Sequence, residues 1–262
     1  MILTVDIGNT TIALALFRCT TKEPIFVEHI ESNCSIAVLP YSEWIAETLK
    51  KHNVNPTHIQ GAVLSSVVPP LTQTLCDAII KVIGISTYVI NARTDAGLTI
   101  KNYDVSTLGS DRIVDAVSAM LQWAPPLVVL DLGTATTVSV IDSDGGFIGG
   151  LIMPGPTIGI KALSSKTAQL PAIDFKQMAP TNIIGQDTKT CLCNGAIIGT
   201  AAAIDGIISR VENELGTPVT VVATGGHCKQ ILPWCYKQIQ YEEHLLLKGL
   251  YHIYHNQTQK NC

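Results

Sequence analysis

LTVDIGNTT, the sequence of residues 3–11, decides the fold because its pattern returns as VVLDLGTATT at residues 128–137. Each copy is a short apolar run that ends in an aspartate, followed by an apolar residue, a glycine, a hydroxyl-rich turn and a second apolar run. The two aspartates are Asp6 and Asp131, so nearly half of the 262-residue chain separates them. This spacing predicts a duplicated domain, because it is far too long for a solenoid repeat.

The segments that follow extend both copies in the same order. Each copy reads as a strand, a tight turn and a second strand, and a third apolar run follows at residues 24–30 and 147–153. Periodicity and turn residues then predict strands at 59–65, 87–90 and 219–223, and helices at 42–52, 71–83, 110–123, 187–215 and 244–255. Strand triplets followed by helices, given twice, predict an α/β fold of two similar domains, residues 1–118 and 119–262, with a cleft between them.

Composition narrows the class of protein and its partners. Hydrophobic residues make up 47% of the chain and charged residues 15%, a balance that suits buried strands and helices and argues against a disordered or fibrous protein. The formal net charge is −4, and the densest basic pair is Lys50-Lys51. A protein that neutralises several phosphates usually carries a basic face, so we expect no nucleic acid as the main partner.

The sequence predicts neither a membrane segment nor secretion. No stretch approaches the roughly 18–20 consecutive apolar residues that span a bilayer. The start, MILTVD, lacks the basic region of a signal peptide and reaches Asp6 too early for one. Eight cysteines are scattered along the chain, and the closest pair, Cys191 and Cys193, lacks the spacing of a zinc site. We therefore expect a cytoplasmic protein with reduced, mostly structural thiols.

The first aspartate-glycine turn has the groups of a phosphate site. A strand that ends in Asp6 beside Gly8 presents one carboxylate and several backbone N–H groups in the same small space. Backbone amides and hydroxyls can hold phosphate oxygens, while the carboxylate holds hydrated Mg²⁺. A β-hairpin with a polar turn is the alternative interpretation of one copy taken alone.

The second copy strengthens the phosphate interpretation. Its turn, residues 131–137, would face the first across the cleft, and Thr224-Gly225-Gly226 follows a further apolar strand. Paired turns of this kind grip ATP in the superfamily of sugar kinases, actin and Hsp70-type ATPases, which this order of motifs resembles. His227, directly after the two glycines, is interpreted as an exposed loop histidine in preference to a residue that approaches ATP.

Gly109-Ser110-Asp111-Arg112, at the start of a predicted helix, allows two interpretations. Asp111 in the first turn of a helix can simply stabilise the helix. Aimed into a cleft, it could instead accept the proton of a substrate hydroxyl that attacks a γ-phosphorus. Arg112 could then bind a substrate oxygen or the charge that develops on the phosphoryl group.

Taken in order, these motifs resemble the type III pantothenate kinase family over nearly the whole chain. The matching pieces are DIGNT at 6–10, LSSVVP at 64–69, GL at 97–98, GSDR at 109–112, DLGTATT at 131–137, GGLIMPG at 149–155 and TGG at 224–226. The resemblance implies duplicated RNase H-like domains, as in the actin, Hsp70 and sugar-kinase superfamily. It also implies ATP-dependent phosphorylation of pantothenate to 4'-phosphopantothenate, the first step of coenzyme A biosynthesis.

The resemblance further implies roles for single residues. The ATP site would comprise Asp6, Ile7, Gly8, Asn9, Thr10, Thr11, Ile12, Ala13 and Thr134. Pantothenate would contact Tyr103, Gly109, Ser110, Asp111, Arg112 and Thr188, with Asp111 as the general base. Asp131 would ligate a monovalent cation, K⁺ or NH₄⁺, and Asp6 would hold Mg²⁺ through water. In such kinases the substrate pocket is completed across a homodimer interface.

Departures from the family pattern and two rival functions accompany the resemblance. Residues 103–108 lack the proline expected before the Gly-x-Asp-Arg turn, and Ser110 stands where alanine is commoner. One rival is a transcriptional accessory or regulatory protein of the same sequence group, and the other is a sugar kinase or a phosphatase of the same superfamily. The intact Asp6, Asp111, Arg112 and Asp131 argue against lost kinase chemistry.

Overall fold

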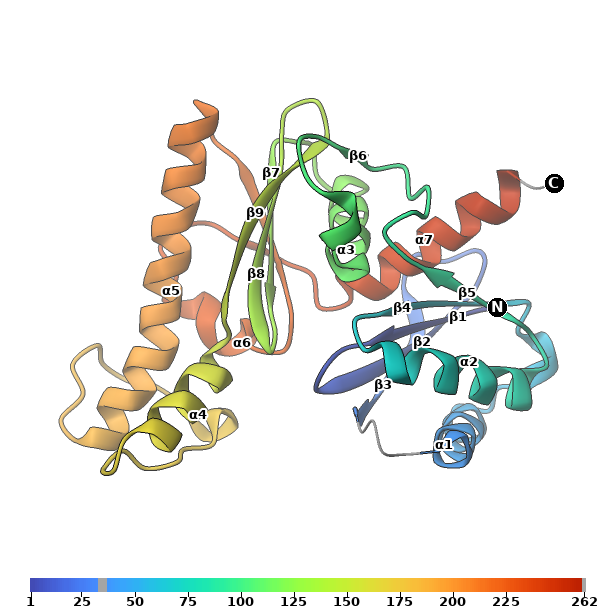
Figure 1. Ribbon diagram of the computed structural model, residues 1–262, viewed down its shortest axis with the longest axis horizontal. Coiled ribbons are helices and arrows are strands. Elements are labelled where there is room, and N and C mark those ends of the chain that lie inside the picture. Colours follow the sequence, from blue (N-terminus) through green and yellow to red (C-terminus); the bar gives the residue numbers. More distant parts are fainter. Residues whose placement is uncertain (33–36, 261–262) are drawn as a thin grey trace. The chain divides into compact units, whose positions relative to one another are not determined.

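The structure, a computed structural model, describes residues 1–32 and 37–260 (Figure 1). Contacts between Cα atoms divide the chain into two compact units. The first unit comprises Met1–Leu98, Asp104–Ser118 and His244–Cys262, and the second comprises Thr99–Tyr103 and Ala119–Glu243. The chain therefore enters each unit more than once.

The first unit contains a five-stranded mixed sheet in the order β3-β2-β1-β4-β5. Its strands are β1 (Ile2–Ile7), β2 (Thr11–Phe17), β3 (Pro24–Glu31), β4 (Gly61–Ser66) and β5 (Thr87–Ile90). The central strand β1 pairs antiparallel with β2 and parallel with β4. Its almost continuously apolar sequence suits a strand that is covered on both faces.

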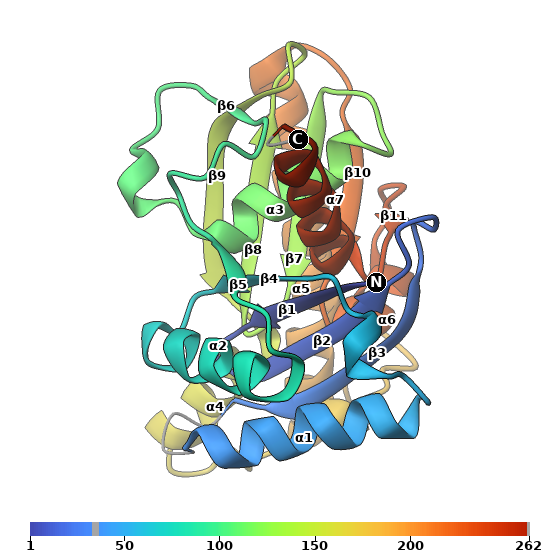
Figure 2. The same ribbon diagram turned by 90° about the vertical axis from the view of Figure 1, so that its right-hand side faces the viewer.

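Helices cover both faces of this sheet (Figure 2). They are α1 (Val38–Lys51), α2 (Pro69–Ile83), α3 (Ser110–Met120) and α7 (Leu245–Lys260). Helices α1 and α2 pack against Leu3, Val5 and Ile7 on one face, whereas α3 and α7 pack with Ile2 and Val63 on the other. Successive side chains of a strand point to opposite faces, so the residues of β1 contribute to two core layers.

Helix α7 lies with the first unit, although residues 244–262 follow the boundary expected at residues 118 and 119. The reason is packing, because Leu247, Leu250 and Ile253 are buried in the same apolar cluster as Ile2 and Val63. Residues 99–103 differ in the opposite sense. They lie in the second unit, where a short strand within them joins the edge of the second sheet.

The second unit repeats the strand arrangement of the first. Its sheet has the order β11-β10-β7-β8-β9-β6. The strands are β6 (Thr99–Ile100), β7 (Leu127–Leu132), β8 (Ala135–Ile141), β9 (Gly146–Pro154), β10 (Thr220–Thr224) and β11 (Gln240–Tyr241). Strand β7 is antiparallel to β8 and parallel to β10, as β1 is to β2 and β4. The shared order confirms the predicted α/β duplication.

The helices of the second unit are α4 (Pro156–Lys166), α5 (Thr188–Leu215) and α6 (Cys228–Ile231). Asp187 caps α5 by accepting a 2.8 Å hydrogen bond from the Thr190 N–H, and Thr190 closes a capping box. Among the described residues, α5 is the one helix long and apolar enough to cross a membrane by length and composition. Its buried residues Ile197, Ile204 and Ile208 pack into the core cluster of the sheet, as those of a core helix do.

Several elements differ from the predicted ones at their ends. Helix α1 begins at Val38, four residues before the predicted start, without a side-chain cap. The predicted strand at 59–65 begins at Gly61, because a short 3₁₀ turn, Pro56–His58, precedes it. Strands β6 and β11 and helix α4 have no counterpart among the predicted elements.

Candidate functional site

Hydrogen bonds within the first unit hold the turn between β1 and β2 in place. The Gly8 N–H donates to the Thr11 carbonyl at 3.0 Å, and the Gly8 carbonyl accepts from the Ser32 hydroxyl at 2.6 Å. The Ser32 N–H donates to the Thr10 carbonyl at 2.9 Å. These bonds fix the backbone of the turn while the side chains of residues 9–11 stay exposed to solvent.

The predicted ATP-site residues 6–13 divide into two kinds. Asp6 is half-buried at the end of β1, in register with Ser65 of the neighbouring parallel strand. Ile7 and Ile12 are fully buried in the apolar core, so only their main-chain atoms are available to a ligand. The turn therefore offers backbone groups, two threonine hydroxyls, one amide and one carboxylate.

The Gly-x-Asp-Arg turn lies beside that strand pair. Ser110 is buried, and its hydroxyl is 2.9 Å from the hydroxyl of Ser65. Ser65 of β4 is the register partner of Asp6 of β1. The bond therefore places the start of α3 on β4, the strand next to the one that carries Asp6. The first unit thus brings the Asp6 turn and the Asp111 turn to the same edge of its sheet.

Asp111 is half-buried in the first turn of α3. Its Oδ1 accepts a 2.8 Å hydrogen bond from the Arg112 N–H. Burial raises the pKa of the Asp111 carboxyl above its usual value, although the hydrogen bond and the charge of Arg112 oppose this shift. A side chain at Gly109 would collide with Oδ1, so the glycine is needed for this carboxylate position. Arg112 itself is 6% exposed.

The second aspartate-glycine turn resembles the first in the position of its aspartate. Asp131 is half-buried at the end of β7, in register with Thr224 of the parallel strand β10. The burial pattern of β7 is the same as that of β1, residue for residue. The Gly133 N–H donates to the Ala135 carbonyl, two residues later, at 3.2 Å, whereas the Gly8 N–H donates to the Thr11 carbonyl, three residues later. The second turn is therefore one residue shorter than the first.

Two further segments close around Asp131. Gly225 has a φ of +101°, and a Cβ on it would lie 2.5 Å from the Asp131 carboxylate oxygen. The His227 N–H donates to the Leu132 carbonyl at 3.0 Å. At the start of α4, a side chain on Gly155 would collide with the carbonyl oxygens of residues 133 and 134. The Thr224-Gly225-Gly226 turn, the start of α4 and the Asp131 turn therefore meet at one place in the second unit.

His227 differs from the exposed loop histidine that the sequence suggested. It is half-buried, its ring lies edge-on to Phe175 with centroids 4.5 Å apart, and its Nε2 is 3.2 Å from the Thr157 hydroxyl. Burial lowers the pKa of His227, so its neutral form is favoured. Thr157 is not among the residues that the sequence motifs identified, although Gly155-Pro156 before it is a recognisable helix start.

The remaining predicted substrate residues lie in the second unit. The ring of Tyr103 is edge-on to Phe147, with centroids 5.3 Å apart. Thr188 is exposed at the first position of α5. Thr134 is in the turn that follows Asp131. Among the described residues, no group of three or more His, Cys, Asp or Glu side chains could hold a metal ion, so Asp6 and Asp131 each offer a single carboxylate.

Comparison with known proteins gives the family. A model of the family "Type III pantothenate kinase" matches residues 2–210. A type III pantothenate kinase from Agathobacter rectalis is 34% identical over 99% of both chains. A conserved Baf family protein from Campylobacter jejuni has a similar structure, with a TM-score of 0.61 and 19% identity over 98% of this chain and 99% of that one. A ROK hexokinase from Thermus thermophilus, with a TM-score of 0.53 and 11% identity over 99% of both chains, shares the fold. Since both the family model and a full-length relative agree, the chain belongs to the type III pantothenate kinase family.

Proposed function

We propose that Asp111 is the general base with which this chain phosphorylates pantothenate. As a member of its family the chain is an ATP-dependent pantothenate kinase, which makes 4'-phosphopantothenate in the first step of coenzyme A biosynthesis. The observation that carries the role of Asp111 is the Ser65–Ser110 hydrogen bond, because it holds the Asp111 turn on β4 at the residue that pairs with Asp6 of β1.

The chemistry follows from these groups. The Asp111 carboxylate accepts the proton of the primary hydroxyl of pantothenate as that oxygen attacks the γ-phosphorus, and ADP leaves with the electrons of the broken P–O bond. A carboxyl group whose pKa is raised by burial holds a proton more strongly, which favours this transfer. Phosphoryl transfer otherwise asks mainly for positioning and charge compensation.

Residues 6–13 and Thr134 form the proposed ATP site. In the first turn, the backbone and the side chains of Asn9, Thr10 and Thr11 would bind phosphate oxygens. The hydrogen bonds that the carbonyls of Gly8, Thr10 and Thr11 accept support that role, because these bonds keep the backbone of the turn in one conformation. In the second unit, the turn at Thr134 and the Gly225-Gly226 turn would contribute the other contacts to the nucleotide.

The two half-buried carboxylates fit hard cations. Mg²⁺ usually keeps several waters and takes one or two carboxylates plus phosphate oxygens, which suits Asp6. Asp131 would ligate K⁺ or NH₄⁺, with main-chain oxygens, water or phosphate completing the shell. Bound there, the cations would offset the charge of the triphosphate, which a chain with a net charge of −4 does not do alone.

Pantothenate would contact Tyr103, Gly109, Ser110, Arg112 and Thr188 besides Asp111. Ser110 is buried and bonded to Ser65, so its contact with substrate would be made by the backbone. The exposed position of Thr188 at the start of α5 leaves its hydroxyl accessible.

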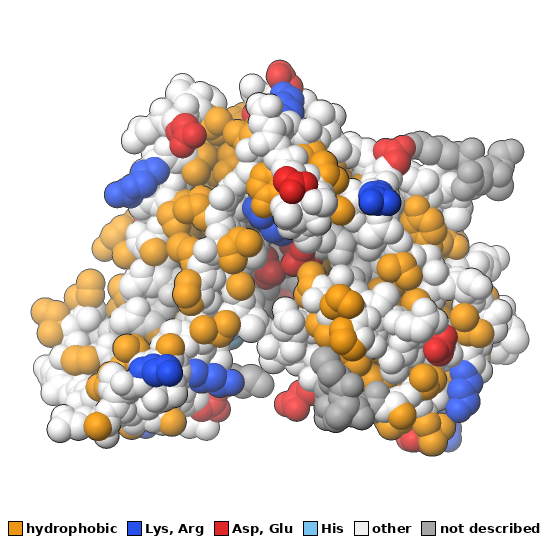
Figure 3. All heavy atoms as spheres, viewed as in Figure 1, with side chains coloured by type: hydrophobic (Ala, Val, Ile, Leu, Met, Phe, Trp, Pro, Cys, Tyr) orange, Lys and Arg blue, Asp and Glu red, His pale blue; other side chains and the backbone are white. Residues whose placement is uncertain are grey.

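We further propose a cytoplasmic homodimer whose interface lies on the second unit. Large apolar side chains are exposed there on β9, on α4 and before α5: Leu151, Ile152, Ile158, Leu163, Ile183 and Ile184. Figure 3 shows hydrophobic side chains at many points on this face of the second unit, interspersed with other side chains. Several large exposed apolar side chains on these segments support a protein interface.

A coupled assay of ADP formation with pantothenate, with and without K⁺, tests the function. Asp111→Asn removes the base with little change in volume, and we expect kcat to fall by at least about a hundredfold. Asp77→Asn, an exposed carboxylate on α2, is the matched control and should keep its turnover. Undiminished turnover in Asp111→Asn would exclude the proposed base. A panel of sugars in the same assay tests the sugar-kinase alternative, and a gel shift at physiological salt tests the regulatory one.

A further inference from the structure

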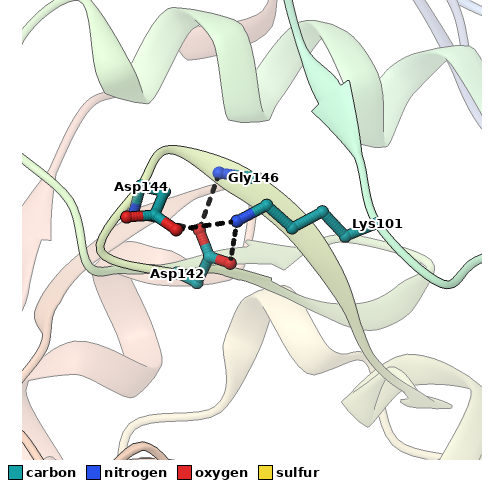
Figure 4. Close-up of polar contacts among 4 residues, drawn as sticks. All are labelled: Lys101, Asp142, Asp144 and Gly146. Carbon is teal, nitrogen blue, oxygen red and sulfur yellow. Dashed lines mark hydrogen bonds and ion pairs between the residues drawn. The ribbon is translucent and has the colours of Figure 1, made fainter.

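The second unit contains an ion-pair cluster (Figure 4), and its lysine stands two residues before Tyr103, a proposed contact of pantothenate. The Lys101 Nζ is 2.6 Å from an oxygen of Asp142 and 3.1 Å from an oxygen of Asp144. Asp142 and Asp144 belong to the turn between β8 and β9, whereas Lys101 directly follows β6. The cluster thus links segments that are about forty residues apart in the chain.

The acceptor side of this cluster is rigid. The second oxygen of Asp142, Oδ1, accepts hydrogen bonds from the N–H groups of Asp144 at 3.1 Å and Gly146 at 2.8 Å. The Asp142 N–H donates to the Gly146 carbonyl at 2.9 Å, and the Gly145 N–H donates to the Asp142 carbonyl at 2.9 Å. Asp142 therefore shapes the turn with one oxygen and binds the lysine with the other.

Lys101 is also fixed by its backbone and its alkyl chain. Its N–H donates to the Phe147 carbonyl at 2.8 Å, which extends the two-residue parallel pairing of β6 with β9. Its alkyl chain lies over Gly146, where an added Cβ would be 2.5 Å from the lysine Cε. A two-residue strand has few hydrogen bonds of its own, so the ion pairs add to the contacts that hold this segment to the sheet.

Tyr103 follows two residues later and depends on the same attachment. Its ring is edge-on to the fully buried Phe147, with centroids 5.3 Å apart. It also lies 3.9 Å from the position of a Cβ on Gly149, a glycine with a φ of +133°. Asn102 between the two has a φ of +54°, an uncommon conformation for a residue other than glycine.

We propose that Lys101, through Asp142 and Asp144, is a positioning residue for pantothenate, because it fixes the segment that presents Tyr103. The inference rests on the proposed contact of Tyr103 with pantothenate. Lys101 does not touch the reacting atoms in this proposal. It sets how much of the time the tyrosine ring is in place for the substrate.

Steady-state kinetics of the full chain with Lys101→Met tests this role. Methionine keeps an apolar chain over Gly146 and removes the charge. We expect KM for pantothenate to rise about three- to fivefold, which is the range for a partly exposed ion pair, while KM for ATP and kcat stay close to wild type. Lys101→Arg should restore most of the loss. Asp142→Asn combined with Lys101→Met should cost little more than Lys101→Met alone.

Lys237→Met is the matched control. Lys237 pairs with Glu212 in the same unit at 2.5 Å, with side-chain exposures of 34% and 24%, against 33% and 20% for Lys101 and Asp142. It should leave both KM values unchanged. A fall of kcat in Lys101→Met, with unchanged KM values for ATP and pantothenate, would indicate a merely structural role and overturn the proposal.

Tyr103→Ala separates this proposal from the function on which it rests. If Tyr103→Ala raises KM for pantothenate and Lys101→Met does not, the positioning role is wrong and the function stands. If Tyr103→Ala has no effect on that KM, the contact and the positioning role are both wrong. Hydrogen exchange of residues 99–104 gives a readout without turnover. It should become faster in Lys101→Met and not in Lys237→Met, and unchanged exchange would overturn the proposal.

Discussion

Glycine at three positions makes room for the carboxylates and carbonyls of the candidate site. Gly109 leaves space for the Asp111 carboxylate, Gly225 for the Asp131 carboxylate, and Gly155 for the carbonyls of the second turn. The sequence identifies these glycines as members of motifs, and the structure gives the physical reason for each. In each case a single Cβ would displace a group that the proposed chemistry needs.

Gly225→Ala should damage both stability and nucleotide binding. The new Cβ would meet the Asp131 carboxylate at 2.5 Å and the Leu132 backbone at 2.7 Å, at a residue whose φ of +101° suits only glycine. We expect the free energy of unfolding to fall by about 1–3 kcal/mol and KM for ATP to rise. Urea denaturation and kinetics measure the two effects. Gly226→Ala, where a Cβ would meet nothing within 4 Å, is the control for stability and should change the free energy of unfolding little.

His227 should make stability depend on pH. Burial lowers its pKa in the folded state, so the unfolded chain binds a proton more readily than the folded one as the pH falls through the histidine range. The contribution of His227 to the free energy of unfolding is therefore fully present above about pH 6.5, the pKa of histidine in the unfolded chain. It is lost as the pH falls through the lower pKa of His227 in the folded chain. His227→Gln keeps a hydrogen-bonding group near Thr157 and removes the titration. The urea midpoint should drop less between pH 7.5 and pH 5 in this variant than in wild type. Equal drops in the two proteins would contradict the prediction.

At the scale of elements, the repeated hairpin was predictable from the sequence, whereas the elements and contacts that pack around it were not. Strands β1 and β7 are recognisable because an apolar run, an aspartate and a glycine recur in one order, and local pattern reports such features well. Helix α4 has a weak apolar pattern, and β6 is two residues long and is stabilised by pairing with β9, so neither leaves a clear periodic signal. The pairing of Ser65 with Ser110 is equally invisible in sequence, because tertiary packing brings the two serines together.

The Ser65–Ser110 hydrogen bond should hold the start of α3 on β4. Both serines are buried, so replacing either one leaves the other hydroxyl with a lost partner, which costs about 1 kcal/mol. We expect Ser65→Ala and Ser110→Ala each to lower the free energy of unfolding by that amount and Ser65→Ala to lower kcat as well. The double variant should be less destabilised than the sum of the two, since the coupling belongs to the pair. Strict additivity in urea denaturation would mean that the hydrogen bond contributes nothing measurable.

At the scale of the whole molecule, duplication gives two units with one strand order, and packing decides which segments belong to each. The sequence predicts the duplication because Asp6 and Asp131 stand half a chain apart. It does not predict that the last helix returns to the first unit, because a chain boundary and a packing boundary are different things. The apolar residues of α7 are evident in the sequence, yet nothing local says which sheet they cover.

Leu250→Ala should therefore destabilise the first unit before the second. Leu250 is fully buried in the cluster that contains Ile2 and Val63, and removing three carbons from such a site costs about 2–5 kcal/mol. Hydrogen exchange should show protection lost first in β1 and β4, while β7 and β10 keep theirs at low denaturant, because proteins open in local cooperative units. Leu246→Ala, a partly buried neighbour on the same helix, should lose much less. If β7 and β10 lost protection first, α7 would stabilise the second unit, and the division of the chain into these two units would have to be redrawn.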